Sequence, residues 1–262
     1  MRILLFASDT IGLEIAQFLY DKKDTPVVLV LDNADRGGCN DEIIRSSGVA
    51  ENSIVYSDKL GVNETVKWLQ DLQLDIGVMV WWPNIINKTI IDIPKRGIVN
   101  FHPSFLPYNR GRDPSFWSLL NSTPFGVTIH KVDEGIDTGD IIVQEKLNVV
   151  WEDTAKSLYE EARISLVSLF KRYYDDIKED RIALTPQDLN TGSCHYRKDL
   201  NNASHINLDK KYKASDLLNL LRAKTFYPYP AAWFEDDGKK YEVQIKIKQV
   251  NNEKQNKKLL EL

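Results

Sequence analysis

Three polar side chains occupy positions from which they could move a proton and stabilise a negatively charged oxygen. Asn100 and His102 lie two residues apart at the end of an apolar run, so both should project from one face of a strand. An imidazole titrates near neutral pH, and a carboxamide N–H can donate to an oxyanion. Asp137, in a glycine-containing turn, could orient the imidazole or favour its protonated form. Each residue alone also fits an ordinary structural role.

The elements that must position these residues alternate between strands and helices. Apolar residues at consecutive positions predict buried strands over 3–7, 27–31, 76–82 and 97–101. Helical spacing separates these runs, and this alternation predicts an α/β fold with a Rossmann-like, mostly parallel sheet. Ligands bind at the carboxyl ends of the strands in such a sheet, which is where Asn100 and His102 are expected.

The chain changes character after residue 125. Two consecutive strands are expected over 126–132 and 141–149, and they are joined by the acidic turn that contains Asp137. Apolar residues then recur every three or four positions from about Thr154 to Asp180. This spacing predicts a long helix with Thr154 as its N-cap.

A second, smaller domain is expected after Pro186, where the sequence becomes polar and then rich in aromatic residues and proline. We place a catalytic domain at 1–185 and a small mixed C-terminal domain at 186–262. The pattern predicts a short helix over 215–222 and an alternating strand over 241–250. A charged, mobile tail is expected over 251–262. The alternating strand is a possible surface for forming a homodimer.

The composition excludes several classes of protein. A net charge of -4 and a pI near 5.7 argue against an obligate nucleic-acid binder, which needs a basic field. The two cysteines are far apart and indicate no disulfide framework, so a cytoplasmic location is expected. No apolar run approaches membrane-spanning length, and no cluster of residues has metal-ligand spacing. The turn after the first strand contains only Gly12, which disfavours a dinucleotide site.

The order and spacing of five short motifs resemble the formyltransferases that use N10-formyltetrahydrofolate. The motifs are Asn100-Phe101-His102-Pro103-Ser104, Leu106-Pro107, Arg110-Gly111, Gly126-Val127-Thr128-Ile129-His130 and Asp137-Thr138-Gly139-Asp140. The family includes methionyl-tRNA, glycinamide ribonucleotide and sugar N-formyltransferases, and the resemblance covers about residues 1–185. It implies the formyltransferase fold, direct acyl transfer without a metal, and a catalytic trio of Asn100, His102 and Asp137.

The resemblance also implies where the folate lies. In this family the pterin occupies a cleft between the segment upstream of the Asn-x-His strand and the loop before the catalytic aspartate. Here Trp82, Ile85 and Ile86 would form apolar walls, and the loop that includes Asp133 and Glu134 would contact the pterin edge. The neighbouring Trp81 fits core packing equally well.

The sugar N-formyltransferases match best among the three acceptor classes. The turn at 8–12 lacks the phosphate-holding loop of glycinamide ribonucleotide enzymes, and the C-terminal part is shorter than that of the tRNA enzymes. By contrast, 109–118 and 221–234 are similar to segments of the sugar enzymes, although Ala231 stands where those usually have glycine. A dTDP-4-amino-4,6-dideoxyglucose acceptor, used for surface glycans such as O-antigen, fits this likeness.

A nucleotide-sugar needs a flat apolar surface for its base and cations for its diphosphate. Candidate aromatic contacts are Phe226, Tyr229 and Trp233. Candidate cations are Arg110, Arg112, Arg197, Lys198 and Lys224. The aromatic residues could equally form the core of the small domain.

Other functions remain open on the sequence alone. The acceptor could be a UDP-linked sugar, a 3-amino sugar or methionyl-tRNA. A hydrolase that releases formate from formyltetrahydrofolate would use the same trio with water as acceptor. A folate-binding scaffold without activity is a further possibility, which the presence of all three residues disfavours.

Overall fold

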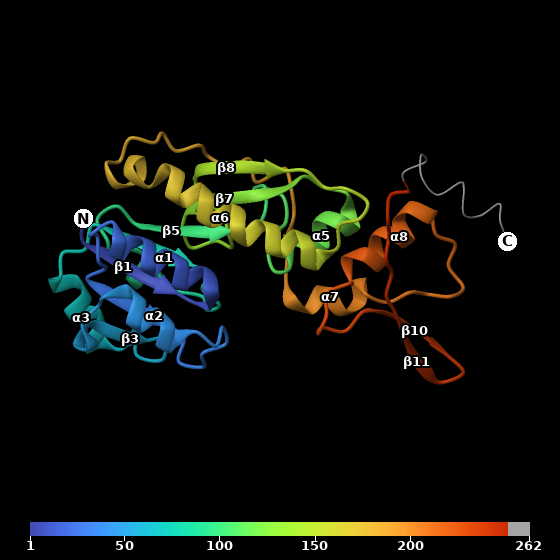
Figure 1. Ribbon diagram of the computed structural model, residues 1–262, viewed down its shortest axis with the longest axis horizontal. Helices are drawn as coiled ribbons and strands as arrows, with labels where there is room; N and C mark the ends of the chain where they lie inside the picture. Colours follow the sequence, from blue (N-terminus) through green and yellow to red (C-terminus); the bar gives the residue numbers. More distant parts are fainter. Residues whose placement is uncertain (251–262) are drawn as a thin grey trace, which may run out of the picture.

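A seven-stranded sheet occupies the N-terminal side of the molecule, with strand order β3-β2-β1-β4-β5-β7-β8 (Figure 1). The computed structural model describes residues 1–250, so the predicted tail 251–262 lies outside the described residues. The strands are β1 (Ile3–Ala7), β2 (Val28–Leu31), β3 (Ile54–Tyr56), β4 (Ile76–Val80), β5 (Ile98–His102), β7 (Phe125–Lys131) and β8 (Ile141–Leu147). Strands β1 to β5 are parallel to one another. Strand β7 pairs antiparallel to β5, and β8 pairs antiparallel to β7. The predicted α/β fold with a mostly parallel sheet is therefore confirmed.

Helices cover both faces of this sheet and bury its apolar side chains. One face packs against α1 (Asp9–Asp21), α2 (Asn40–Ser47) and α6 (Ala155–Lys178). The other packs against α3 (Asn63–Asp71) and α4 (Lys88–Ile91). Strand β1 is buried on both faces along its whole length, as its continuous apolar run predicts.

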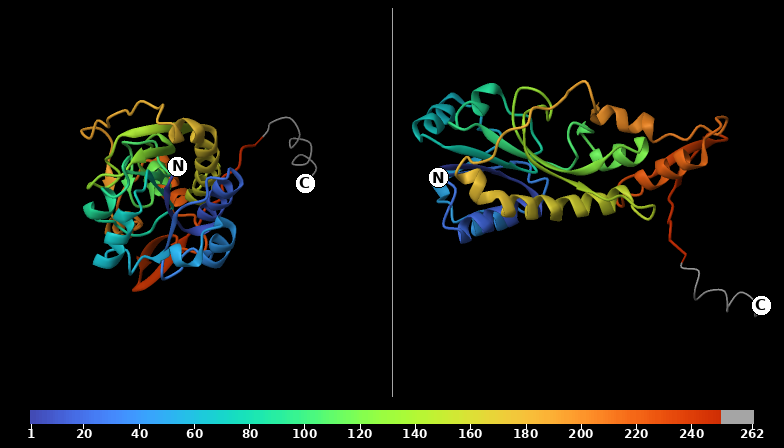
Figure 2. Two further views of the ribbon diagram at one scale, coloured as in Figure 1. Left: turned by 90° about the vertical axis from the view of Figure 1, so that its left-hand side faces the viewer. Right: turned by 90° about the horizontal axis from the view of Figure 1, so that it is seen from above.

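The long helix α6 runs along the length of the molecule and connects the sheet to the C-terminal elements (Figure 2). Thr154 caps it as expected: its hydroxyl accepts from the Ser157 amide at 3.2 Å, and the Ser157 hydroxyl accepts from the Thr154 amide at 3.0 Å. This capping box satisfies two amide groups that the first turn would otherwise leave unpaired.

The C-terminal elements lie at one end of the elongated molecule (Figure 1). They are α7 (Arg197–Ala203), α8 (Ala214–Ala223), β10 (Ala232–Asp236) and β11 (Lys239–Val243). Helix α8 packs against α5 (Pro114–Asn121), and its residues Leu220 and Leu221 join the core that also covers the sheet. A small mixed C-terminal domain is present, and its main helix shares a core with the rest of the chain.

Two predictions for this region differ from the structure. The alternating strand expected over 241–250 is a hairpin strand that ends at Val243, because only this part pairs with β10. Helices α5 and α7 were not expected: both are short, and α7 lies in a polar stretch without a clear apolar period.

The polar stretch after residue 185 forms a separate two-stranded sheet with the loop that follows β5. Strand β9 (Cys194–His195) pairs in parallel with β6 (Arg110–Gly111), the short strand that follows the loop after His102. The linker between the two parts of the chain therefore borders the candidate site.

Candidate active site

Strand pairing places the predicted catalytic residues at one end of the sheet. Asn100 is the third and His102 the last of the five residues of β5, and their side chains are half-buried and buried, respectively. The antiparallel strand β7 sets His130 directly opposite Asn100 and Thr128 opposite His102. Residues opposite each other in an antiparallel pair share a face of the sheet, so His130 joins the two side chains.

Asp137 completes a compact cluster. Its Oδ2 atom lies 3.4 Å from Nδ1 of His102, and its Oδ1 atom lies 3.5 Å from Nε2 of His130. The Gly111 amide donates to Oδ2 at 2.9 Å, and Nδ2 of Asn100 donates to Oδ1 at 3.4 Å. The structure thus brings Asn100 and His102 of β5 together with Asp137 from the turn between β7 and β8.

The turn that presents Asp137 depends on local backbone geometry and on the linker. Asp137 has a φ of 52°, a left-handed value that aspartate tolerates better than most residues. The side-chain Nε2 atom of Gln187 donates to the backbone carbonyls of Asp137 and Gly139, at 3.0 and 2.6 Å. A side chain from the segment after the predicted domain boundary therefore holds the turn.

Burial and charge set the protonation states of the pair His102 and Asp137. Burial lowers the pKa of His102 below its usual value, although the Asp137 carboxylate opposes that shift. Burial alone would raise the pKa of Asp137, but the charge of His102 and the hydrogen bond from the Gly111 amide oppose it, so the pKa falls below its ordinary range. Near neutral pH the arrangement is thus an ionised carboxylate beside an imidazole that can accept a proton.

Sequence reasoning did not assign a role to His130. Its Nδ1 atom donates to the Lys131 carbonyl at 2.6 Å, which leaves Nε2 to accept from Nδ2 of Asn100 at 3.2 Å. His130 therefore orients the Asn100 carboxamide. The signal available in the sequence was a histidine in an otherwise apolar strand, but the register with β5 was needed to interpret it.

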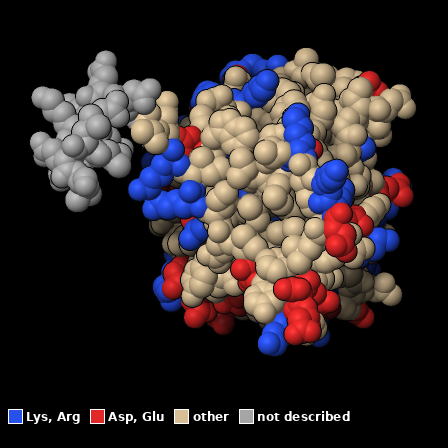
Figure 3. Space-filling model, turned by 90° about the vertical axis from the view of Figure 1, so that its right-hand side faces the viewer, with Lys and Arg blue, Asp and Glu red and all other residues tan. Residues whose placement is uncertain are grey.

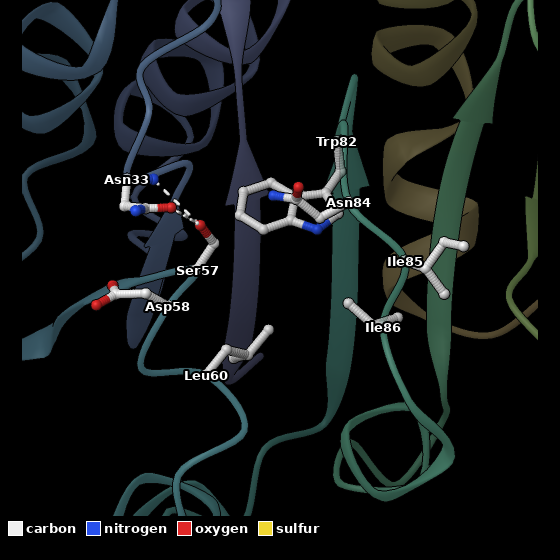
Figure 4. A pocket seen from close by; sticks show the side chains of 8 residues that line it. All are labelled: Asn33, Ser57, Asp58, Leu60, Trp82, Asn84, Ile85 and Ile86. Atoms are coloured by element: carbon white, nitrogen blue, oxygen red, sulfur yellow. Dashed lines mark hydrogen bonds between the residues drawn. The ribbon is translucent and has the colours of Figure 1, made fainter. Parts of the chain in front are cut away.

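The predicted folate walls line a hollow near the carboxyl ends of β2, β3 and β4. The hollow has a volume of about 300 Å³, and Figure 4 shows its lining side chains. The lining residues are Asn33, Ser57, Asp58, Leu60, Trp82, Asn84, Ile85 and Ile86. Trp82 packs edge-on against Phe6, and its buried Nε1 atom has no hydrogen-bond partner within residues 1–250. Ile85 is 95% exposed, so it could cover a ligand only from the rim.

Asp133 and Glu134, the two predicted acidic contacts of the folate, bind other protein groups in this structure. Asp133 accepts from the Gly135 amide at 3.0 Å and from the Thr138 hydroxyl at 2.6 Å. Glu134 forms an exposed ion pair with Lys88 at 3.0 Å. Val132, at the start of this loop, packs in the same apolar cluster as Trp82 and Ile86, so the loop and the hollow are neighbours.

The predicted cations gather around Asp113 rather than along a single strand. Desolvation raises the pKa of this carboxyl, and the charges of Arg112, Lys224 and Arg197 oppose that shift. Burial likewise lowers the pKa of Lys224, against the charges of Asp113 and Glu242. Arg110 lies beside them in β6, and its buried Nε atom has no hydrogen-bond partner in the described part of the chain. Lys198 lies near the exposed Tyr196 ring.

The three predicted aromatic contacts fall into two places. Phe226 packs edge-on against Tyr159 of α6 and against Tyr229, with ring centroids 5.3 Å apart in both pairs. Tyr159 in turn accepts a hydrogen bond from Nε1 of Trp81 at 3.1 Å. Trp233, by contrast, packs against His205 and lies under the Lys240 ammonium at 4.3 Å. The group of Phe226 and Tyr229 borders the catalytic domain, and Trp233 belongs to the hairpin.

Two kinds of feature are absent from the described part of the chain. Within residues 1–250, no three His, Cys, Asp or Glu side chains are arranged to hold a metal ion. No helix in that range combines the length and apolar character needed to cross a membrane.

Comparison with known proteins gives a consistent result. Residues 1–170 match the family model described as Formyl transferase, and residues 199–249 match the N-formyltransferase dimerization C-terminal domain. A methionyl-tRNA formyltransferase from Thermodesulfovibrio yellowstonii is 33% identical over 178 residues, which are 67% of this chain and 56% of that protein. The chain spans 56% to 58% of the length of four methionyl-tRNA formyltransferases that it matches, and 82% of a fifth.

Solved structures extend the likeness over almost the whole chain. A 4-N formyltransferase from Francisella tularensis aligns with a TM-score of 0.79 and 26% identity, covering 95% of this chain and 98% of that one. The formyltransferase PseJ from Anoxybacillus kamchatkensis was solved with UDP-4,6-dideoxy-4-formamido-L-AltNAc and tetrahydrofolate. It aligns with a TM-score of 0.56 and 27% identity, covering 86% of this chain and 100% of that one.

Proposed function

The chain belongs to the Formyl transferase family, and from this premise we propose that it formylates the amine of a nucleotide-linked amino sugar. The formyl donor is N10-formyltetrahydrofolate, and the proposed acceptor is dTDP-4-amino-4,6-dideoxyglucose, for surface glycan synthesis. The observation that carries the proposal is the cluster of Asn100, His102 and Asp137 at the end of β5. PseJ, with a bound UDP-linked 4-formamido sugar and tetrahydrofolate, supports a nucleotide-linked amino sugar as the class of acceptor and a folate as the donor.

The reaction forms a bond between the acceptor nitrogen and the formyl carbon and breaks the bond from that carbon to N10. A proton must leave the acceptor amine and reach N10. His102 is suited to carry it, because its lowered pKa leaves the imidazole free to accept a proton and Asp137 then faces the charged ring. Both N–H groups of Asn100 are occupied in this structure, one by His130 and the other by the longer contact of 3.4 Å to Asp137. The N–H that faces Asp137 would turn to the negative oxygen in the transition state.

The hollow near the carboxyl ends of β2, β3 and β4 fits a flat heterocycle with polar edges. Trp82 and Ile86 supply apolar walls, and the unpartnered Nε1 atom of Trp82 is a donor that a ligand could satisfy. We assign the pterin ring of the folate to this region, with the loop that contains Asp133 and Glu134 as its second border.

The acceptor would lie between the catalytic cluster and the C-terminal elements. Phe226 and Tyr229 offer ring surfaces for a base, and Arg110, Arg112, Arg197 and Lys224 supply positive charge for a diphosphate. The match to a dimerization domain supports a homodimer that forms through the C-terminal elements.

Methionyl-tRNA is the second candidate acceptor, because curated relatives carry that activity. A tRNA-binding surface needs a broad basic field. On the molecular end shown in Figure 3, neutral side chains predominate, lysines and arginines are dispersed, and acidic side chains gather along one edge. The observed charge pattern on this face therefore favours a small anionic acceptor over a tRNA.

The test is formyl transfer to a panel of dTDP- and UDP-linked 3-amino and 4-amino sugars and to methionyl-tRNA, followed by product mass and tetrahydrofolate release. We expect a formylated dTDP-4-amino sugar, and a loss of about 100-fold or more in kcat for His102→Ala, Asn100→Ala and Asp137→Ala. Asn52→Ala, an exposed asparagine far from the cluster, is the matched control. Folate turnover without a formylated acceptor would indicate a hydrolase, and formylated methionyl-tRNA alone would refute the sugar assignment.

A further inference from the structure

The His102 ring is held through both of its nitrogen atoms. Nδ1 faces the Asp137 carboxylate at 3.4 Å, and Nε2 lies 3.3 Å from the backbone carbonyl oxygen of Asn109. Both partners are acceptors, so the Asn109 carbonyl favours a proton on Nε2 and the Asp137 carboxylate favours one on Nδ1. In the neutral ring, which carries one proton, the Asn109 carbonyl therefore shifts the balance towards the Nε2–H tautomer and fixes the orientation of the ring.

Asn109 needs support to present its carbonyl in this direction. It is fully buried and has a φ of 55°, a left-handed value that asparagine adopts more readily than most residues. Its side-chain amide donates to the Thr123 hydroxyl at 2.8 Å. Its backbone amide donates to the Ser193 hydroxyl at 3.3 Å, and its Oδ1 atom accepts from that hydroxyl at 3.2 Å.

Ser193 is itself fully hydrogen-bonded. Because its hydroxyl proton goes to Asn109, the contact of 2.9 Å to Nε2 of His195 must have histidine as donor. Burial lowers the pKa of His195, which suits a neutral ring with its proton on Nε2. That ring stacks on Trp117, with centroids 3.9 Å apart and planes 6° from parallel.

The backbone around Ser193 is fixed against the same loop. The amides of Arg110 and Arg112 donate to the carbonyls of Ser193 and His195, at 2.9 and 3.0 Å. Gly192 has a φ of 77°, and a Cβ atom there would overlap the carbonyl oxygen of Pro107. These contacts make the linker a wall of the site rather than a loose connection.

We propose that Asn109 and Ser193 are positioning residues that hold His102 in the tautomer and ring orientation used for proton transfer. The C-terminal linker thereby controls the catalytic histidine from a part of the chain more than 80 residues away. The inference rests on the proposed role of His102 in formyl transfer.

The first test is the tautomer of His102, measured by NMR on the substrate-free protein labelled with ¹⁵N-histidine at neutral pH. The wild-type ring should show a single form protonated at Nε2. Ser193→Ala and Asn109→Ala should each produce a mixture of tautomers, because the Asn109 carbonyl is no longer fixed. An unchanged Nε2–H form in both variants would overturn the proposal. If Asn109→Ala does not fold, Thr123→Val replaces it, since it removes the other support of the Asn109 side chain.

The second test is kinetic and uses the acceptor identified from the panel. We expect Ser193→Ala to lower kcat by about 10- to 100-fold while the KM for the folate changes by less than about 2-fold, since misorientation affects the chemical step. Ser193→Thr, which keeps the hydroxyl, should recover most of the rate. Combining Ser193→Ala with Asn109→Ala should add little to the larger single effect, because both act through one contact.

The matched control is Thr191→Val in the same linker, whose exposed hydroxyl donates only to the Asp188 carbonyl. It should leave both the tautomer and kcat unchanged. Equal losses in Thr191→Val and Ser193→Ala would point to general disturbance of the linker and overturn the positioning role. The NMR measurement needs no acceptor, so it decides the proposal even if no amino sugar is formylated.

Discussion

Two opposed effects set the pKa of the His102 imidazole, and a substitution that removes one of them tests the other. Burial lowers its pKa, whereas the Asp137 charge raises it. Removing that charge in Asp137→Asn should therefore lower the His102 pKa further, as followed by NMR titration of the histidine ring. Asp188→Asn, outside the cluster, should leave the titration unchanged. A His102 pKa that rises in Asp137→Asn would show that the carboxylate does not stabilise the charged ring.

At the scale of elements, helix α6 offers a test of how the sheet is tied to the C-terminal part. Its first turn depends on the Thr154–Ser157 capping box. Thr154→Ala should lower the free energy of unfolding by about 1 kcal/mol, because an amide of the first turn loses its acceptor. Urea unfolding measures the change, and Thr154→Ser should retain most of the stability. A loss in Thr154→Ser as large as that in Thr154→Ala would contradict the capping role.

At the scale of the whole molecule, the aromatic residues of the C-terminal part divide into a candidate base surface and a structural group. Tyr229 is 63% exposed and packs on Phe226, so Tyr229→Ala should raise the KM for the nucleotide-sugar by about 10-fold, as expected for a lost stacking contact. Tyr227→Ala is the control, since Tyr227 is 76% exposed in the same segment. Steady-state kinetics at a fixed folate concentration measure the KM of both variants. A larger increase in KM for Tyr227→Ala would show that the base contacts Tyr227 rather than Tyr229.

The oligomeric state is also a property of the whole molecule. The C-terminal match to a dimerization domain predicts a homodimer, so light scattering after size exclusion should give twice the chain mass of 30.1 kDa. A particle of single-chain mass at micromolar concentration would exclude a stable dimer.

The sequence alone determined the elements whose pattern is local. Continuous apolar runs predicted β1, β2, β4 and β5 to within two residues at each end, and apolar spacing with Thr154 predicted α6. The Asn-x-His spacing placed two polar side chains on one face of a strand, since strand periodicity is a local property. The family likewise followed from motif order and spacing.

Only the tertiary structure decided which distant residues meet. The register of β7 with β5 brought His130 to Asn100, and the return of the linker brought Ser193 to Asn109 and Gln187 to the Asp137 turn. The same folding separated Trp233 from Phe226, which lie close in sequence. These contacts depend on strand register and chain reversal over long sequence separations, which residue type and local periodicity do not encode.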